Sequence, residues 1–580
     1  MCGINGIISN KRINKSLFYK YITNLRHRGP DDLGIHIDNN IALGHTRLSI
    51  LDLSEKGHQP MVSDCGDFVI VYNGEVYNFD GIKKNLEKKG YKFQSNTDTE
   101  VILKGFIEYK EKILDKLNGM FAFAIYNKRD NSLFLARDRS GIKPLYYADL
   151  GNVFAFSSEL KGLPVENKSL NEKALIYFLV FGSVPEPFSI YKNIYAFPAG
   201  YYGIYKDGKF ILKRYYEYTF EPKFNIPYDK AVNETKNLFY KSVERHLISD
   251  APIGVFLSGG LDSSSIVAVA KQFKEDVTTI SLVFNEKEFS EEFYQNKVVD
   301  KFKTNHIKFL ITEKLFLEHI QKFLDTMEQP TIDGLNTYFV SLATKENGLK
   351  AVLSGIGGDE IFFGYPSFRY IRYLKFIPIF LAKILKQKNS LKKFEYFSLN
   401  NELGYYLLFR GFFTPSEISE ILNISLQEIF DSLEELYTKY YKINGNFSFM
   451  EDINSYFELS MYMKNQLLKD SDLFSMAHSV EIRVPLLDKE LLDFVLKVKP
   501  NYKFGKYNKQ LLVDTLKDIL PREIYNRKKM GFTLPFEVWF RKNIDMFNIP
   551  KDLKKKFLSG QEKWAKVWGL YVLNKFLAGN

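Results

Sequence analysis

The chain has 580 residues, 45% hydrophobic and 26% charged, which excludes both a single small domain and a disordered chain. Its formal net charge is +11, but the lysines are scattered among glutamates without a basic stripe or a nucleic-acid reader motif. We therefore expect no nucleic-acid partner. The two cysteines, Cys2 and Cys65, are too few for a disulfide framework and suit a reducing compartment.

Two further patterns argue against secretion and membrane insertion. The chain start, MCGINGIISNKRINKS, lacks the basic-then-apolar pattern of a signal peptide. The longest apolar run, 376–385, contains Pro378 and Lys383 and is too short to cross a bilayer. We expect a cytoplasmic protein without a membrane partner.

The first ~160 residues show period-2 alternation interrupted by turn residues, which is typical of β-strands. Two helical stretches accompany them. This pattern predicts an α+β domain with antiparallel sheets. The predicted strands are Phe68–Tyr72, Met120–Tyr126, Leu133–Ala136 and Val153–Phe156, and the predicted helices are Asp80–Lys89 and Thr99–Tyr109.

Residues 164–227 carry several prolines and a hairpin signal at Lys206–Lys209, and we interpret them as a junction. From residue 228, strands alternate with helices, which predicts an α/β domain with a doubly wound parallel sheet. After residue 360 the pattern is almost entirely helical. The predicted domains are 1–215 and 228–580. The strands predicted in the second are Ile253–Leu257, Val277–Phe284, His306–Ile311 and Lys350–Ser354.

Cys2 could act as an N-terminal nucleophile. Removal of Met1 would leave Cys2 with a free α-amine whose pKa of about 8 suits a base at neutral pH. Asn73 and Gly74 follow a predicted strand and offer a side-chain amide and a backbone N–H to an oxyanion. Arg47 and Asp98 could hold the carboxylate and the amine of an amino acid.

A glycine-rich loop, FLSGGLDSS at Phe256–Ser264, follows a strand and opens a helix. Glycines let the backbone approach a phosphate, and the helix N-terminus adds N–H donors. The spacing is not that of a Walker A loop. A second turn, SGIGGDE at Ser354–Glu360, follows another strand of the same sheet. Asp262 and Asp359 are therefore predicted to bind Mg²⁺ together at the carboxyl ends of the strands.

The N-terminal motifs resemble those of class II glutamine amidotransferases, a family with an N-terminal nucleophile and αββα layers. By that resemblance Cys2 attacks the glutamine amide, Asn73 and Gly74 hold the oxyanion, and Arg47, Glu75 and Asp98 hold glutamine. The motifs are MCGI, HRGPDD (His27–Asp32), HTRLSILD (His45–Asp52), GHQPM (Gly57–Met61), YNGEVYN (Tyr72–Asn78), TDTE (Thr97–Glu100) and ARDRSGIKPLYY (Ala136–Tyr147).

The C-terminal motifs SMAHSVEIRVPLLD (Ser475–Asp488) and RKKMGF (Arg527–Phe532) resemble the glutamine-hydrolysing asparagine synthetase family. The resemblance implies ATP and Mg²⁺ as cofactors, aspartate as acceptor, a catalytic Lys529 and a homodimer. An acyl-AMP intermediate would react with ammonia arriving through a buried, mostly apolar passage. The implied ATP-binding residues are Leu257, Ser258, Gly259, Gly260, Asp262, Ser263, Ser264, Val283, Ser354 and Gly355.

One position departs from that family. Many of its members have Glu where this chain has Ile356, and isoleucine can neither donate nor accept a proton. Glu360 and Asp333 are nearby candidates for the missing role. The acceptor could then be another carboxylate, such as a uronic acid of a surface-polysaccharide precursor. A regulatory protein with inactive sites is the other alternative, and the intact Cys2, Asn73 and Asp262 argue against it.

Overall fold

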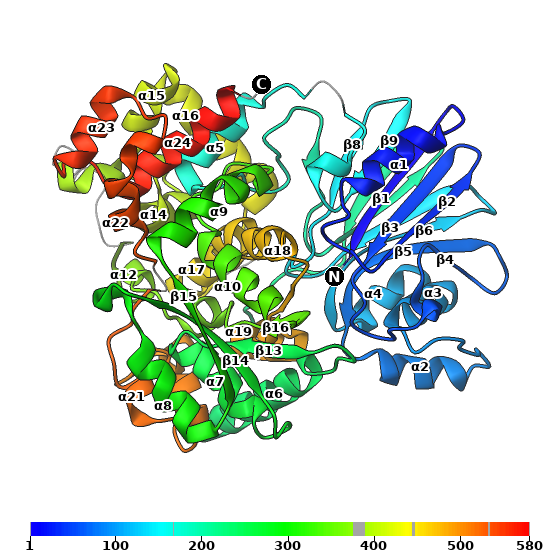
Figure 1. The fold of residues 1–580 in the computed structure, drawn as a ribbon, viewed down its shortest axis with the longest axis horizontal. Coiled ribbons are helices and arrows are strands. Elements are labelled where there is room, and N and C mark those ends of the chain that lie inside the picture. Colours follow the sequence, from blue (N-terminus) through cyan, green and yellow to red (C-terminus); the bar gives the residue numbers. More distant parts are fainter. Residues whose placement is uncertain (1, 166–167, 375–388, 444–446, 532–533, 579–580) are drawn as a thin grey trace.

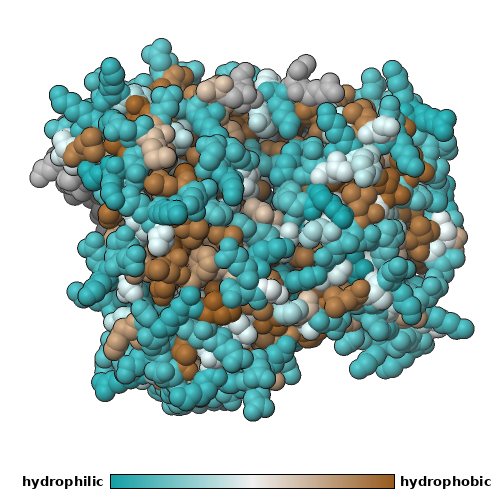
Figure 2. Space-filling model, in the orientation of Figure 1, coloured by the Kyte–Doolittle hydropathy of each residue, from teal (hydrophilic) through white to brown (hydrophobic). Residues whose placement is uncertain are grey.

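The computed structural model describes residues 2–165, 168–374, 389–443, 447–531 and 534–578, and Figure 1 shows that the chain forms two halves. Met1, the apolar run 376–385 and Phe532 of the C-terminal motif lie outside the described residues. Hydrophilic residues dominate the face drawn in Figure 2. In the described part of the chain, no helix is long and apolar enough to cross a membrane.

The N-terminal half contains two six-stranded antiparallel sheets, ordered β10-β8-β9-β1-β3-β2 and β12-β11-β7-β6-β5-β4 among the described residues. This confirms the predicted α+β fold with antiparallel sheets. The strands are β1 (Gly3–Ser9), β2 (Asp32–Asp38), β3 (Ile41–Arg47), β4 (Met61–Val62), β5 (Phe68–Val76), β6 (Gly119–Asn127), β7 (Ser132–Arg137), β8 (Tyr146–Asp149), β9 (Val153–Ser157), β10 (Tyr195–Ala196), β11 (Tyr201–Lys206) and β12 (Lys209–Arg214).

Strand β5 shows why these strands are apolar on both faces. Val69 and Val71 point into the core between the two sheets, where they join Ile4 of β1. Phe68 and Ile70 point the other way, into a core beneath α2 (Phe79–Glu87) and α3 (Asp98–Tyr109). On the outer face of the other sheet lies α1 (Lys15–Thr23). Because side chains alternate across a strand, two buried faces require an unbroken apolar run.

The C-terminal half is built on a parallel sheet, which confirms the predicted α/β class. Its described strands have the order β15-β14-β13-β16-β17. They are β13 (Ile253–Phe256), β14 (Thr278–Phe284), β15 (Asn305–Ile311), β16 (Ala351–Leu353) and β17 (Glu481–Arg483). The prediction of an almost entirely helical chain after residue 360 missed β17, which pairs in parallel with β16.

Helices cover this sheet and fill the end of the molecule where the chain turns red in Figure 1. They are α6 (Tyr228–His246), α7 (Leu261–Ala270), α8 (Glu292–Phe302), α9 (Glu313–Thr326), α10 (Leu335–Glu346), α11 (Gly358–Phe362), α12 (Ser367–Leu374), α14 (Glu402–Arg410), α15 (Pro415–Leu422), α16 (Leu426–Leu436), α17 (Met450–Phe457), α18 (Lys469–Met476), α19 (Lys489–Lys497), α20 (Gln510–Leu516), α21 (Arg522–Tyr525), α22 (Phe536–Lys542), α23 (Lys551–Leu558) and α24 (Trp564–Ala578).

One helix from the predicted junction packs in the C-terminal core. Helix α5 (Glu172–Phe181) buries Ile176, Phe178 and Val180 in the cluster that also contains the strands of the parallel sheet. The backbone N–H of Phe412 donates to the carbonyl of Val180 at 2.7 Å. The hairpin predicted at residues 206–209 is confirmed, since it joins β11 to β12.

Buried ion pairs hold the two halves together. The Arg28 guanidinium lies 2.7 Å from Glu159 Oε1 in its own half and 2.8 Å from Asp472 Oδ2 in the other half. All three side chains are almost fully buried. At the solvent-exposed edge of the same interface, Lys350 Nζ lies 2.7 Å from Asp31 Oδ2.

We expect Arg28→Ala to lower the free energy of unfolding by about 3–5 kcal/mol, because it leaves Asp472 buried without its cation, whereas Glu159 keeps Lys161 at 2.7 Å. Arg129→Ala is the control, since the Arg129 pair with Asp67 is exposed and should change stability little. Unfolding monitored by circular dichroism measures both. Equal losses in the two variants would show that the buried pairs do not hold the halves together.

Candidate functional site

Cys2 lies immediately before β1, buried at the boundary between the two halves. Its backbone nitrogen donates to Asn73 Oδ1 at 2.9 Å, and its carbonyl accepts from Arg28 Nε at 3.0 Å. Burial raises the pKa of the Cys2 thiol, so a nearby base must take the proton at neutral pH. If Met1 is removed, the nitrogen held by Asn73 becomes an α-amine placed to do this.

Asn73 and Gly74 lie inside β5, and not after a strand as we predicted. They pair with Ala122 and Phe121 of β6. Asn73 Nδ2 is buried and has no hydrogen-bond partner among the described residues. It is therefore a free donor beside the thiol, as an oxyanion site requires. A Cβ on Gly74 would lie 2.2 Å from the Met120 carbonyl, so only glycine fits there.

The two residues predicted to hold glutamine's charged groups have different surroundings. Arg47 ends β3, and its guanidinium donates to the carbonyls of Ser54 at 2.8 Å and Asp52 at 2.5 Å. Arg47 thus also fixes the loop at 51–54. Asp98 begins α3 and accepts from the Tyr72 hydroxyl at 2.6 Å. Burial raises the pKa of Asp98 to about 6.

Glu75 brings the second half of the chain into this site. Its carboxylate lies 3.4 Å from Arg483 of β17, which in turn pairs with Glu481 at 2.6 Å. Sequence reasoning missed both β17 residues. The alternation of apolar and charged residues in SVEIRVP, 479–485, is a strand signal that could have revealed them.

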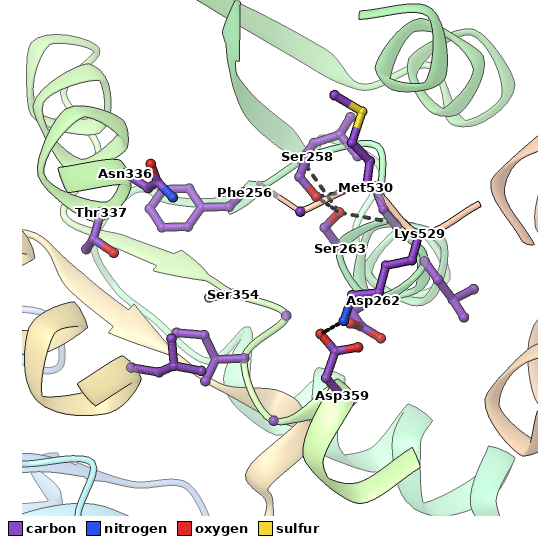
Figure 3. Close-up of a pocket in the computed structure, with 18 of the residues that line it drawn as sticks. Phe256, Ser258, Asp262, Ser263, Asn336, Thr337, Ser354, Asp359, Lys529 and Met530 are labelled. Carbon is purple, nitrogen blue, oxygen red and sulfur yellow. Dashed lines mark hydrogen bonds and ion pairs between the residues drawn. The ribbon is translucent and has the colours of Figure 1, made fainter. Parts of the chain in front are cut away.

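A cavity of about 440 Å³ opens at the carboxyl ends of the parallel strands (Figure 3). Ser258 and Ser263 of the first loop hydrogen-bond to each other, with their hydroxyls 3.0 Å apart. Ile356 and Lys529 also line the cavity. Of the predicted ATP-binding residues, the lining includes Leu257, Ser258, Gly260, Asp262, Ser263, Ser354 and Gly355.

Three predicted ATP-binding residues do not line this cavity. Ser264 is fully buried in α7, and Val283 is on β14, where Ile280 and Leu282 line the cavity instead. Gly259 has a φ of +77° and packs against Tyr294. In this conformation glycine is favoured because it has no Cβ.

Asp262 and Asp359 meet at the cavity wall, as the two-loop prediction required. Lys509 Nζ lies 2.5 Å from a carboxylate oxygen of each. Lys529 Nζ lies 2.8 Å from Asp359 Oδ2 (Figure 3). Burial raises the pKa of Asp359, but Lys509 and Lys529 outweigh it and hold that pKa at about 2. A Cβ on Gly358 would lie 2.5 Å from Asp262, so the second loop needs glycine there.

Lys509 was not predicted. It lies in an ordinary surface-like stretch, KYNKQ, and no local pattern marks it. Only the fold brings it between the two carboxylates, where its side chain is almost fully buried. Its position shows that the acidic pair attracts a cation.

Both candidates for the role missing at Ile356 line the cavity. Glu360 is buried and accepts from the Tyr365 hydroxyl at 2.7 Å. Burial, followed by the charge of Asp359, raises the pKa of Glu360 to about 7, which suits proton transfer at neutral pH. Burial also raises the pKa of Asp333.

A smaller cavity of about 20 Å³ lies between the two sites. Asp470 lines both this cavity and the larger one. Ionisable groups, including Arg28, Glu159 and Asp472, dominate its wall. The mostly apolar passage expected from the sequence stays a prediction.

Comparison with known proteins agrees with this arrangement. Residues 1–216 match the family model of a glutamine amidotransferase domain, and residues 234–551 match that of asparagine synthase. The chain belongs to the asparagine synthase family. The glutamine-hydrolysing asparagine synthetase 1 of Bacillus subtilis is 33% identical, covering 94% of this chain and 89% of that protein. Asparagine synthetase 3 of the same organism is 30% identical, covering 98% and 89%.

For this family member, we expect Asp262→Asn and Asp359→Asn each to slow ATP-dependent pyrophosphate release by about a hundredfold or more, because each removes a hard anionic ligand beside the phosphates. Glutamate release from glutamine should persist, since that site lies in the other half. Asp276→Asn, an exposed change, is the control. Normal pyrophosphate release by either site variant would exclude that residue as a required ligand.

Proposed function

We propose that the chain is a glutamine-hydrolysing asparagine synthetase: a carbon–nitrogen ligase that converts aspartate, glutamine and ATP to asparagine, glutamate, AMP and pyrophosphate. The observation that carries this proposal is the pairing of two sites in one chain, a buried Cys2 beside a free Asn73 donor and a cavity with two acidic loop residues. The named relatives support the choice of aspartate. The two free thiols support a cytoplasmic location.

In the first half, the Cys2 thiolate attacks the carbon of the glutamine side-chain amide. Asn73 Nδ2 and the Gly74 N–H stabilise the oxyanion, while Arg47, Glu75 and Asp98 hold the substrate. Collapse of the intermediate releases ammonia and leaves a thioester, which water hydrolyses to glutamate. The α-amine of Cys2 takes the thiol proton and passes a proton to the leaving group.

In the second half, the aspartate side-chain carboxylate attacks the α-phosphorus of ATP, and pyrophosphate leaves. Ammonia then attacks the acyl carbon of the acyl-AMP, and AMP leaves. Lys529 and Lys509 lie where they can balance charge on the phosphates, and Glu360 can accept the proton that the amide nitrogen loses.

Asp262 and Asp359 are the residues we propose to hold Mg²⁺. Asp262 Oδ1 is buried without a hydrogen-bond partner among the described residues, as an oxygen reserved for a cation would be. The described residues contain no cluster of three or more metal-ligating side chains there, so these two carboxylates would hold Mg²⁺ together with oxygens of water and substrate phosphate. When bound, Mg²⁺ neutralises charge that develops on the departing pyrophosphate.

Ammonia is proposed to cross between the halves beside Asp470, which lines both the small and the large cavity. The domain division that goes with this route is 1–215 for ammonia production and 228–580 for ATP cleavage. A uronic acid remains the second candidate acceptor, because Ile356 lines the cavity where many relatives carry a carboxylate.

Cys2→Ala tests the division of labour. We expect it to abolish asparagine formation from glutamine and to leave formation from ammonium within about twofold, since Cys2 is needed only to release ammonia. Cys65→Ala is the control, because this thiol is exposed and does not line the ATP cavity. Loss of ammonium-dependent synthesis in Cys2→Ala would refute the separation of the two steps.

Ile356→Glu tests the acceptor. Ile356 is partly buried and packs against the apolar core, so a carboxylate there would lie among apolar side chains, and activity with aspartate should not rise. Ile356→Leu preserves the apolar character and is the control. Steady-state rates with aspartate and galacturonate decide the matter: a large gain with aspartate would show that Ile356 impairs an aspartate site.

A further inference from the structure

A second cavity of about 740 Å³ adjoins the ATP cavity. We call it the outer cavity. Asp333 and Tyr462 line both cavities, so the two meet at these residues. Much of its wall comes from the helical part of the C-terminal half, including α14, the helical segment Glu458–Leu468 and the start of α24 (Figure 1). Volumes of roughly 300–1,000 Å³ are typical of sites for small-molecule ligands.

The outer cavity is rich in cations. Its wall carries three acidic residues, Asp333, Glu417 and Glu562. The wall also carries five basic residues: Lys392, Lys393, Arg410, Lys563 and Lys566.

Two of the five cations have a carboxylate of their own. Arg410 lies 2.7 Å from Glu458, and Lys566 lies 2.5 Å from Glu417. The remaining three, Lys392, Lys393 and Lys563, have no carboxylate within ion-pair distance among the described residues.

An anionic ligand would gain most binding free energy at these three lysines. Lys393 Nζ makes only a long contact of 3.4 Å to the Phe409 carbonyl. Burial, and then repulsion from Lys563, Lys566 and Arg410, lowers the pKa of Lys393 to about 8. An anion among these groups would relieve the repulsion and form charge-assisted hydrogen bonds.

The rest of the wall suits a polar ring with hydroxyl groups. Gln466 and Gln561 offer amide donors and acceptors, and Trp564 and Phe412 offer aromatic faces. Free aspartate needs neither this volume nor a second anion site. The cavity has room for a larger molecule, and Asp333 and Tyr462 are where its carboxylate would have to enter the ATP cavity.

We propose that the outer cavity extends the acceptor site, so that the enzyme also amidates sugar acids that carry a phosphate group, with Lys392, Lys393 and Lys563 binding the phosphate. This inference rests on the proposed function, because it uses the same ATP and ammonia chemistry. The sugar-acid carboxylate attacks the α-phosphorus of ATP and displaces pyrophosphate. Ammonia then displaces AMP from the acyl carbon and, after losing a proton, leaves the primary amide.

The test compares four acceptors: aspartate, glucuronic acid, glucuronic acid 1-phosphate and UDP-glucuronic acid. Glutamine-dependent pyrophosphate release is measured with each, and the amide product is identified by mass spectrometry. We expect the two phosphorylated acids to be amidated with kcat/KM at least tenfold above that of glucuronic acid. Similar kcat/KM values for the two phosphorylated acids would show that the lysine cluster binds the phosphate and not the nucleoside.

Variants of these lysines test whether the cluster binds the phosphate group. Lys393→Ala/Lys563→Ala should raise KM for the phosphorylated acids about tenfold or more, with aspartate kinetics changed less than twofold. Lys551→Ala/Lys555→Ala removes the same charge from exposed sites outside the cavity and is the matched control. Lys563→Glu, a change at an exposed residue that should not disturb folding, should weaken the phosphorylated acids further.

The outcomes separate the inference from the proposed function. If aspartate is amidated and neither phosphorylated acid is, the outer cavity is not an acceptor site and the proposed function stands. If the phosphorylated acids react but the lysine variants match the control, the cluster does not bind the phosphate and the inference fails. If no acceptor supports pyrophosphate release, both fail.

Discussion

A charge buried in a protein interior must have an opposite charge close by, and this constraint fixes how the two halves meet. Arg28 lies between Glu159 of its own half and Asp472 of the other. Arg483 reaches across in the opposite direction to Glu75. Neither half can slide without leaving a carboxylate or a guanidinium unpaired at low dielectric. The two reaction sites are thereby held at a constant separation.

Strand β17 makes this connection direct. The carbonyl of Arg483 accepts a hydrogen bond from the N–H of Ser354 at 2.8 Å, at the start of the loop that carries Asp359. The side chain of the same residue lies beside Glu75, in the strand that also carries Asn73. A shift of β17 would therefore move residues of both sites. One short strand, with a buried arginine, gives the enzyme a physical basis for coordinating ammonia release with ATP cleavage.

Local patterns in the sequence were sufficient to predict much of the fold and of the candidate site. The apolar runs of β5 and β6 and the strand–glycine–helix loops at 256–264 and 354–360 predicted both fold classes and the meeting of Asp262 with Asp359. Other features depend on long-range contacts. Lys509 joins the site only because the fold places it between Asp262 and Asp359, which are far from it in the sequence. The outer cavity likewise joins residues from 181 to 566, which no local pattern could bring together.

The packing of α5 bears on how such enzymes can evolve. The helix belongs in sequence to the ammonia-producing half, but Phe178 and its neighbours complete the apolar core of the other. A recombination point at 216–227 would transfer the helix without the surface that receives it. An exchanged half would expose an apolar helix and leave a hole in the recipient's core. In this chain the two halves therefore share an apolar core, even though each has its own chemistry.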